Sequence, residues 1–298
     1  KSYAVLPPVG GVLLGTAAAG IKYKGRTDLL VAKMLEGTQV AGVFTTSKTA
    51  SAPVEWCRNN IADNGEGRML VVNSGNSNAF TGKAGVATVK ATAAAAAQAG
   101  NCRQKDVFIA STGVIGQPMD PEPVVKGIET ALASASEDRW DEAARAIMTT
   151  DTYPKLASVQ VMTDQGTYTI AGISKGAGMI APNMATMLAV IVTDAALPLS
   201  TLDECLRTSA DRTYNRIVVD GDMSPNDTVL LLANGASGVT IHSDTDRARF
   251  QAALDAVCEH LAQAIVRDGE GATTFITLNV SGTATDAEAR QVANTVAT

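Results

Sequence analysis

The chain has 298 residues, of which 46% are hydrophobic, 18% are charged and 4% are aromatic, and its formal charge is −6 at pH 7. These values are typical of a globular protein with a large core, organised as one large domain or two ordinary ones. The acidic balance, without a run of Lys or Arg, argues against a nucleic-acid-binding protein. No window reaches the ~18 consecutive apolar residues of a membrane span. We therefore expect a cytoplasmic protein without membrane or nucleic-acid partners.

In chain order, the first half of the sequence predicts short strands and helices separated by turn residues. These elements are strands at residues 40–45 and 69–73, a helix at 86–99, a strand at 107–110 with a turn at 111–116, and helices at 122–134 and 138–149. The second half continues with strands at residues 167–173 and 187–193, a helix at 200–214, a strand at 228–233, a helix at 247–267, a strand at 273–281 and a helix at 287–296. This mixture predicts an α/β (mixed α+β) fold in which helices are layered against sheet.

Cysteine and histidine are sparse. The four cysteines have no CxxC spacing, which indicates neither a disulfide framework nor a zinc site, so we expect no metal and no reactive thiol. The two histidines, His242 and His260, fall beside a polar loop and on a predicted surface helix. A nucleophile activated by His is therefore disfavoured, and a terminal amine is an alternative base.

The most informative segment is KGAGMIAPNMATMLAVIVTD, residues 175–194, in which a turn containing Gly and Pro runs directly into an apolar stretch. Thr186 lies just inside that stretch, after Ala185. Because Thr is favoured in strands, the pattern alone indicates a buried strand. The alternative is that Thr186 attacks the peptide bond that precedes it. The cut would expose a new N-terminal Thr whose α-amine is the base for its own hydroxyl.

Four further segments place small polar residues and Gly where a simple core does not need them: NSGNSNAFTG at residues 73–82, STGVIG at 111–116, MTTDT at 148–152 and DGEGATT at 268–274. Taken singly, each is most simply a turn. Taken together and in this order, they resemble the ornithine acetyltransferase family, also called glutamate N-acetyltransferases, of the cyclic arginine pathway. The matching segments span nearly the whole chain and are GIKYKGRTDL, NSGNSNAFTG, STGVIG, AIMTTDTYPK, KGAGMIAPNMATMLA, NRIVVDGDMSPNDTVLLLANG and RDGEGATTFI.

The resemblance implies a precursor that cuts itself between Ala185 and Thr186. The products would be an α chain, residues 1–185, which carries the oxyanion hole, and a β chain, residues 186–298, which starts at the nucleophile. Thr186 would accept the acetyl group of N-acetylornithine and pass it to glutamate through an acetyl-enzyme ester. The family also implies no cofactor, acetyl-CoA as a second acetyl donor in some members, and an assembly of two α and two β chains or larger.

Individual residues take roles from the same resemblance. Thr112 and Gly113 fall on the oxyanion-hole pair, and a Thr hydroxyl with a Gly amide is a suitable pair of donors. Thr152, Lys175 and Glu270, together with the nucleophile, fall on substrate-binding positions. Lys175 suits the α-carboxylate of an amino acid, and Glu270 suits either an ammonium group or the orientation of the nucleophile. Without the resemblance, Lys175 and Glu270 would be expected as solvated surface charges.

Two further features of the sequence concern the acidic loop and the C-terminal end. The acidic loop with Asp220, Asp222, Asn226 and Asp227 matches no calcium loop and predicts a hydrogen-bonded turn. Members of the family continue beyond this sequence to a tail that supplies an Asn and a Thr to the substrate pocket, so we expect a C-terminally truncated chain.

Two other functions stay open at the level of sequence. One is an aminopeptidase or amidase in which water takes the acyl group from Thr186. The other is a binding or scaffold protein that keeps the fold without the activity.

Overall fold

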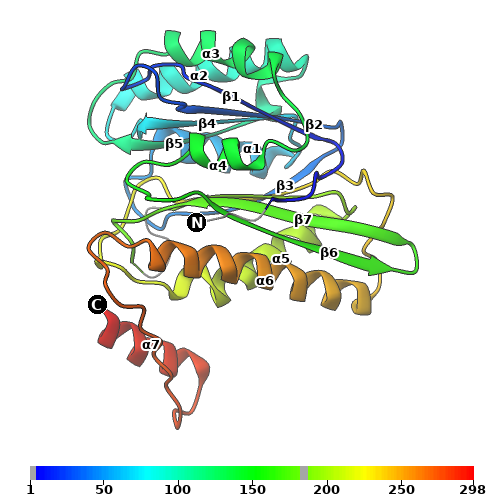
Figure 1. Cartoon of the computed structure of the whole chain (residues 1–298), viewed down its shortest axis with the longest axis vertical. Coiled ribbons are helices and arrows are strands. Elements are labelled where there is room, and N and C mark those ends of the chain that lie inside the picture. The colour runs from blue at the N-terminus through cyan, green and yellow to red at the C-terminus, as the bar shows by residue number, and fades with distance from the viewer. Residues whose placement is uncertain (1–4, 182–186) are drawn as a thin grey trace.

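Two β-sheets stacked face to face form the centre of the molecule, and helices cover the outer face of each sheet (Figure 1). The computed structural model describes residues 5–181 and 187–298. The order of layers is helix, sheet, sheet and helix, which confirms the layered helix–sheet sandwich expected from the mixed pattern.

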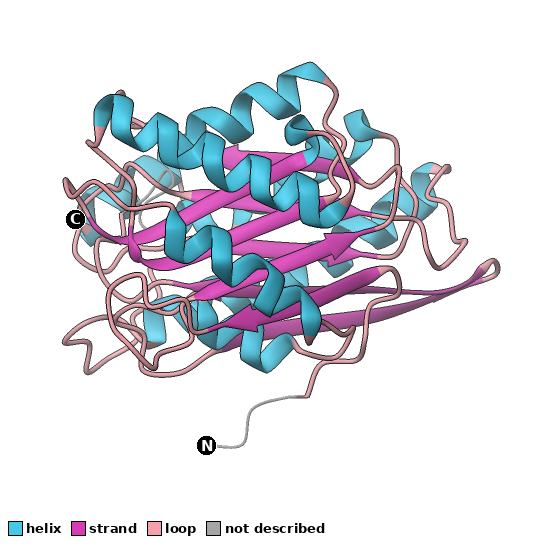
Figure 2. Ribbon diagram, turned by 90° about the horizontal axis from the view of Figure 1, so that it is seen from above, coloured by secondary structure: helices cyan, strands magenta, loops and turns pink. Residues whose placement is uncertain are grey.

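The first sheet has the strand order β1-β2-β4-β5. Its strands are β1 (Val12–Ala17), β2 (Leu29–Met34), β4 (Met69–Asn76) and β5 (Val107–Val114). Strands β4 and β5 run parallel because helix α2 (Gly82–Gly100) connects them across the outer face, whereas the other neighbours are antiparallel. Helices α2 and α3 (Glu122–Ala133) lie across this face, where buried Ala side chains allow close packing (Figure 2).

The second sheet has the strand order β3-β9-β8-β7-β6. Its strands are β3 (Gln39–Phe44), β9 (Thr228–Ala233), β8 (Leu188–Thr193), β7 (Gly166–Lys175) and β6 (Lys155–Thr163). Every residue of the two central strands, β8 and β9, is buried, as is usual for parallel neighbours covered on both faces. Helices α5 (Leu199–Arg212) and α6 (Asp244–Arg267) cover the outer face.

A second core lies between the two sheets, and two helices close its sides. Helix α4 (Trp140–Ala146) packs against β1 of the first sheet and β7 of the second, and α1 (Ala52–Asp63) packs against β5 and β3. Trp140 is buried in this core. On α1, the Trp56 indole N–H donates to the Val107 carbonyl at 2.8 Å. The sheets are therefore joined by packing at both edges as well as face to face.

The structure confirms most predicted elements. The predicted helices correspond to α2, α3, α4, α5, α6 and α7 (Asp286–Ala297), and the predicted strands before residue 234 correspond to β3, β4, β5, β7, β8 and β9. Within the described residues, 3-10 turns lie at Gln104–Asp106 and Tyr214–Arg216. Strands β1, β2 and β6 and helix α1 were not predicted from the sequence.

The predicted strand at residues 273–281 is wrong. Most of its side chains are exposed, and it pairs with no strand in the part of the chain that the structure describes. A segment with β-forming residues becomes a strand only where a neighbour offers hydrogen bonds and packing. The segment leads instead to α7, which projects from the sandwich and has no buried residue (Figure 1).

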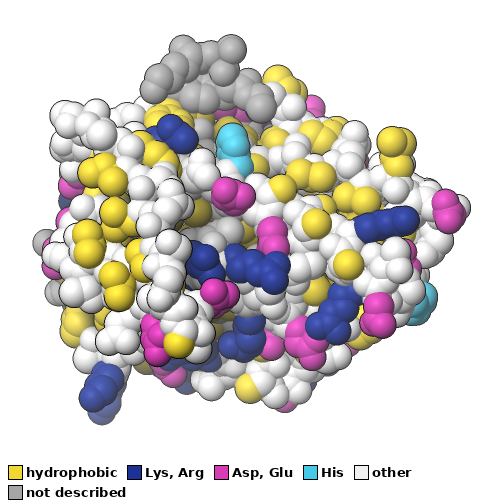
Figure 3. Space-filling view, turned by 90° about the horizontal axis from the view of Figure 1, so that it is seen from below, with side chains coloured by type: hydrophobic (Ala, Val, Ile, Leu, Met, Phe, Trp, Pro, Cys, Tyr) yellow, Lys and Arg dark blue, Asp and Glu magenta, His cyan; other side chains and the backbone are white. Residues whose placement is uncertain are grey.

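The charged surface is mixed in sign. Figure 3 shows Lys and Arg interspersed with Asp and Glu on the face seen from below. Ion pairs such as Arg207–Asp203 and Arg212–Asp255 contribute to this mixture. Among the described residues, no helix combines the length and hydropathy that crossing a bilayer would require.

Candidate active site

The carboxyl ends of β4 and β5 form one wall of the candidate site. Residues 111–114 were expected in a turn, but they continue β5, and the pairing with β4 becomes irregular at Gly75 and Asn76. Gly113 has a φ of 126°, and a Cβ at this position would lie 2.4 Å from the Gly75 carbonyl carbon. Only Gly tolerates that geometry, so the position next to Thr112 requires a residue without a side chain.

Side chains of the 73–82 segment hold this strand end in place. The Ser111 hydroxyl donates to Asn73 Oδ1 at 2.6 Å, and the Asn73 amide donates to the Asn76 carbonyl at 2.9 Å. The Ser77 hydroxyl donates to the Val114 carbonyl at 2.7 Å. The polar residues that the sequence singled out here therefore build a rigid support for residues 111–114, since each side chain is fixed by a partner.

Lys175 connects the second sheet to this wall. It is the last residue of β7 and is only 3% exposed, so the expectation of a solvated surface charge is wrong for this residue. Its Nζ donates to Thr112 Oγ1 at 3.0 Å. A Thr hydroxyl has one proton and two lone pairs. Because Lys175 occupies a lone pair, the Thr112 proton is available to another acceptor.

Three carboxyl groups and a second lysine surround Lys175. Burial lowers the pKa of Lys175, as does Lys155, while Asp151, Asp227 and Glu270 act in the opposite direction. Burial disfavours the Asp151 carboxylate, but Lys175, Lys155 and the Gly176 N–H, which donates at 2.7 Å, together lower the pKa of Asp151 below its usual value. The surroundings therefore favour the ionised form of Asp151 beside Lys175.

A second cluster of buried ions positions Thr152. Lys155 Nζ lies 2.6 Å from Asp151 Oδ1 and 2.6 Å from Asp268 Oδ2. The Thr152 N–H donates to Asp268 Oδ2 at 2.9 Å, and its hydroxyl donates to Asp268 Oδ1. Segments 148–152 and 268–274, far apart in the sequence, are therefore tied together through one lysine and two aspartates.

Glu270 reaches the site from the segment that follows α6. Its N–H donates to the Ala177 carbonyl at 2.7 Å. A Cβ on Gly178 would lie 2.6 Å from the Glu270 carboxyl carbon, so the missing side chain at Gly178 makes room for this carboxylate. Glu270 is exposed, in agreement with the expectation from sequence alone.

Thr186 and Ala185 lie outside the described residues, so the expected nucleophile and cleavage position stay predictions. Met187, the next residue in the chain, is described and buried. Its N–H donates to Asp227 Oδ1 at 2.9 Å, and its carbonyl accepts from the Thr228 N–H at 3.2 Å. On the N-terminal side of the undescribed segment, residues 175–181 include Lys175 and Gly178, and Gly178 lies against Glu270. The described residues therefore bring Thr112, Gly113, Lys175 and Glu270 to the N-terminal side of the segment that contains Thr186, and Asp268 links Thr152 to them.

The acidic loop is a hydrogen-bonded turn, as predicted. The Asp220 carboxylate accepts from the Ile180 N–H at 2.8 Å and from the Met179 N–H, and Asp222 donates its N–H to Asp220. Within the described residues, no group of three or more His, Cys, Asp or Glu side chains is arranged to hold a metal ion.

Three residues of the site were missed by sequence reasoning. Asp151 and Asp268 lie inside segments that the sequence had singled out, so a signal existed, but it did not distinguish them from ordinary turn residues. Lys155 lies inside the matching segment AIMTTDTYPK, but that segment did not reveal its contact with Asp268, which is 113 positions away. A cavity of about 710 Å³ lies apart from these residues, between the first turns of α1 and α2, and is lined by Trp56 and Phe80 among others.

The sequence matches the model of the ArgJ family over residues 13–298. The chain belongs to the ArgJ family. The arginine biosynthesis bifunctional protein ArgJ of Nitrobacter winogradskyi is 48% identical over 301 residues, which cover 98% of this chain and 72% of the relative. This membership confirms the resemblance that the motifs indicated.

Solved structures agree with the ArgJ family assignment. The ornithine acetyltransferase of Mycobacterium tuberculosis, solved in complex with ornithine, has a TM-score of 0.52 and 34% identity, and the match covers 58% of this chain and 92% of that chain. An L-aminopeptidase D-Ala-esterase/amidase from Ochrobactrum anthropi, a variant of the Ntn-hydrolase fold, has a TM-score of 0.53 at 12% identity and covers 88% of this chain and 85% of that chain. At that identity the second likeness concerns the fold alone.

Proposed function

We propose that this chain transfers an acetyl group from N-acetylornithine to glutamate through an acetyl ester on Thr186, after it has cut itself between Ala185 and Thr186. Membership of the ArgJ family supports this reaction. The observation that carries the proposal to the level of residues is the contact of Lys175 Nζ with Thr112 Oγ1 beside Gly113. It places a buried lysine, a hydroxyl and a glycine with a positive φ together at the end of the segment that contains Thr186.

The chemistry needs a base for the Thr186 hydroxyl and donors for the oxyanion. The α-amine created by the cut has an ordinary pKa of about 7.7–8, so a substantial neutral fraction exists near neutral pH without a histidine. The Thr112 hydroxyl and the Gly113 N–H donate to the oxyanion of the tetrahedral intermediate. Lys175 acts through Thr112, because its ammonium group fixes the hydroxyl and favours the developing negative charge.

The remaining residues hold the substrates. Glu270, exposed beside Gly178, faces the amino group of the bound amino acid. Thr152 is exposed next to Glu270's segment and is fixed by Asp268, so it contacts the substrate with little freedom to move. We propose a cytoplasmic location, an assembly of two α and two β chains or larger, and acetyl-CoA as a second donor, in keeping with the word bifunctional in the names of the relatives.

The test combines processing and transfer. Purified protein is incubated at neutral pH and analysed by mass spectrometry for a fragment that begins at Thr186, and N-acetylglutamate is measured after addition of N-acetylornithine and glutamate. Thr186→Ala is expected to abolish both the cut and the transfer. Thr193→Ala, a buried Thr at the other end of β8, serves as the matched control and retains both.

Two results would decide against the proposal. Release of free acetate without N-acetylglutamate would identify an amidase or aminopeptidase, whose acyl group passes to water. A chain that stays intact, with no acetyl label on Thr186 after exposure to N-acetylornithine, would identify a binding protein that keeps the fold.

A further inference from the structure

The last two residues of the acidic loop, Asn226 and Asp227, lie immediately before β9 and are buried, with 6% and 0% of their surface exposed. The backbone of the loop is hydrogen-bonded to Thr45, the residue that follows β3. The Thr45 N–H donates to the Asp227 carbonyl at 3.0 Å, and the Thr45 hydroxyl donates to the Ser224 carbonyl at 2.6 Å. The two side chains therefore extend from a fixed backbone.

Asn226 reaches across to the first sheet. Its Nδ2 donates to the Ser111 carbonyl at 2.8 Å and to the Ser77 carbonyl at 2.6 Å. Ser111 directly precedes Thr112, so the Asn226 amide holds the strand end that presents Thr112 and Gly113. These bonds join residues more than a hundred positions apart.

Asp227 reaches the other half of the site. Its Oδ1 accepts from the Met187 N–H at 2.9 Å. That nitrogen belongs to the peptide bond that joins the proposed nucleophile, Thr186, to Met187. The Asp227 carboxyl group therefore binds the N–H of the peptide that follows the nucleophile. The neighbouring Thr228 N–H donates to the Met187 carbonyl at 3.2 Å, which fixes the following peptide as well.

We propose that Asn226 and Asp227 form a positioning clamp that sets the distance between the oxyanion donors at residues 112–113 and the peptide that follows Thr186. The inference rests on the proposed function. Adjacent residues on one rigid loop contact both halves of the site, so a change in either side chain alters their separation. Acyl transfer needs that separation to within a fraction of an ångström.

The clamp retains polar atoms that a purely structural turn does not need. Asn226 Oδ1 and Asp227 Oδ2 are buried, and neither has a hydrogen-bond partner among the described residues. Leaving such atoms unpaired costs stability. Burial also raises the pKa of the Asp227 carboxyl well above its usual value. The Met187 N–H and the facing charged group, Lys175, lower that pKa, but burial has the larger effect. A carboxyl retained under these conditions is consistent with a role in the site.

The chain provides a matched control for a clamp without catalytic purpose. Asp194 lies just beyond the other end of β8, is 9% exposed, and accepts from the Thr169 N–H at 2.7 Å. It is therefore a second buried carboxylate that holds a backbone amide of the same sheet. Its distance from the proposed nucleophile along β8 removes it from the site.

The experiment compares Asp227→Ala, Asp227→Asn and Asp194→Ala in the full chain. Asp227→Ala is expected to lower kcat for acetyl transfer about 100-fold with KM changed by less than about threefold, because transition-state geometry is lost while binding is kept. Asp227→Asn is expected to recover to within about tenfold of the parent, since its amide oxygen still accepts from Met187. Asp194→Ala is expected to lower the melting temperature but to leave kcat within about twofold.

Two results would overturn the clamp. One is a folded Asp227→Ala protein with the kcat of the parent, and the other is an equal loss of kcat in Asp194→Ala. Where Asp227→Ala does not fold, Asp227→Ser replaces it, because its shorter side chain withdraws the acceptor from Met187 but keeps a polar group. The same outcomes then apply.

The rate of self-cleavage tests the clamp independently of the proposed acetyl transfer. If the parent chain cuts itself but transfers no acetyl group, the proposed transfer is wrong and the clamp is judged from the rate of the cut. Asp227→Ala is expected to slow the appearance of the fragment that begins at Thr186 about 100-fold, and Asp227→Asn to restore most of that rate. Cutting by Asp227→Ala at the parent rate would contradict the clamp.

Discussion

Lys155 gives the sharpest test of the energetics of the site. Its Nζ lies 2.6 Å from carboxylate oxygens of both Asp151 and Asp268, and the side chains of the three residues are 0%, 0% and 2% exposed. Lys155→Met keeps the length and the apolar stem of the side chain but removes the ammonium group. Two buried carboxylates then lose their shared counter-ion.

The expected magnitude follows from burial. Removing one partner of a buried ion pair typically costs about 3–5 kcal/mol, because the remaining charge stays desolvated. Asp151 keeps the Gly176 N–H, and Asp268 keeps the two donors of Thr152, so neither carboxylate is left without any hydrogen bond. We therefore expect about 3–4 kcal/mol, which at about 2 °C per kcal/mol for a chain of this size is a fall in Tm of about 6–8 °C.

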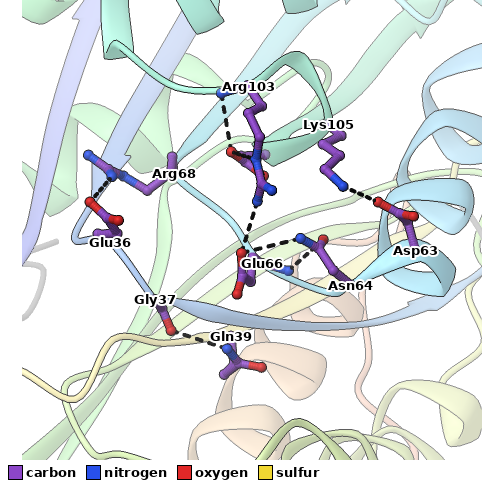
Figure 4. Close-up of polar contacts among 10 residues, drawn as sticks. Glu36, Gly37, Gln39, Asp63, Asn64, Glu66, Arg68, Arg103 and Lys105 are labelled. Carbon is purple, nitrogen blue, oxygen red and sulfur yellow. Dashed lines mark hydrogen bonds and ion pairs between the residues drawn. The ribbon is translucent and has the colours of Figure 1, made fainter.

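The assay is thermal unfolding followed by circular dichroism, with Lys105→Met as the control. Lys105 and Asp63 also lie 2.6 Å apart, but their side chains are 43% and 54% exposed (Figure 4). Exposed pairs contribute about 0–1 kcal/mol, so the control should lower Tm by less than about 2 °C. Equal falls in the two variants, or no fall in Lys155→Met, would refute the argument from burial.

Three further predictions concern the site. Gly113→Ala forces a Cβ to within 2.4 Å of the Gly75 carbonyl carbon at a φ of 126°. The backbone must then shift, and loss of the proposed oxyanion donor should lower kcat about 100-fold or more. An unchanged kcat would show that this strand end is not part of the site. Lys175→Met should lower kcat by a similar factor of about 100 without a matching rise in KM, which steady-state kinetics with N-acetylornithine will measure; a rise in KM alone would assign Lys175 to substrate binding. The lowered pKa of Asp151 means that its contribution to stability is present above its ordinary pKa of 3.8 and is lost as the pH falls through the lower value in the folded protein. The Tm of the parent should therefore fall more steeply below about pH 4 than that of Asp151→Asn, and parallel curves would contradict this assignment.

Elements defined by local pattern were predicted well. The Ala-rich helix α2 and the strand β9 carry their propensity and their boundaries in their own residues. Helix α1 was missed because its position depends on tertiary bonds, such as those of Trp56 and Asn60 to the Val107 carbonyl. The error at residues 273–281 has the opposite cause, because a strong local propensity had no neighbouring strand to pair with.

The candidate site shows the same division. Thr112 and Gly113 were identified because a family motif marks them, and the motif is contiguous. The burial of Lys175 could not be predicted, because its partner Thr112 is 63 residues away and on another sheet. Asn226 and Asp227 were recognised as turn residues, but a turn motif does not reveal which strands its side chains will reach.

The strand order of the second sheet has a consequence for the life of the protein after the proposed cut. Strands β3, β6 and β7 belong to residues 1–185, whereas the central pair β8 and β9 belongs to residues 186–298 and is hydrogen-bonded on both sides to strands of the other product. The two products are therefore interleaved within one sheet, and neither can leave without breaking it. The intact precursor reaches this arrangement by folding as one molecule. After the cut, unfolded products must first associate, so the rate of refolding depends on their concentration.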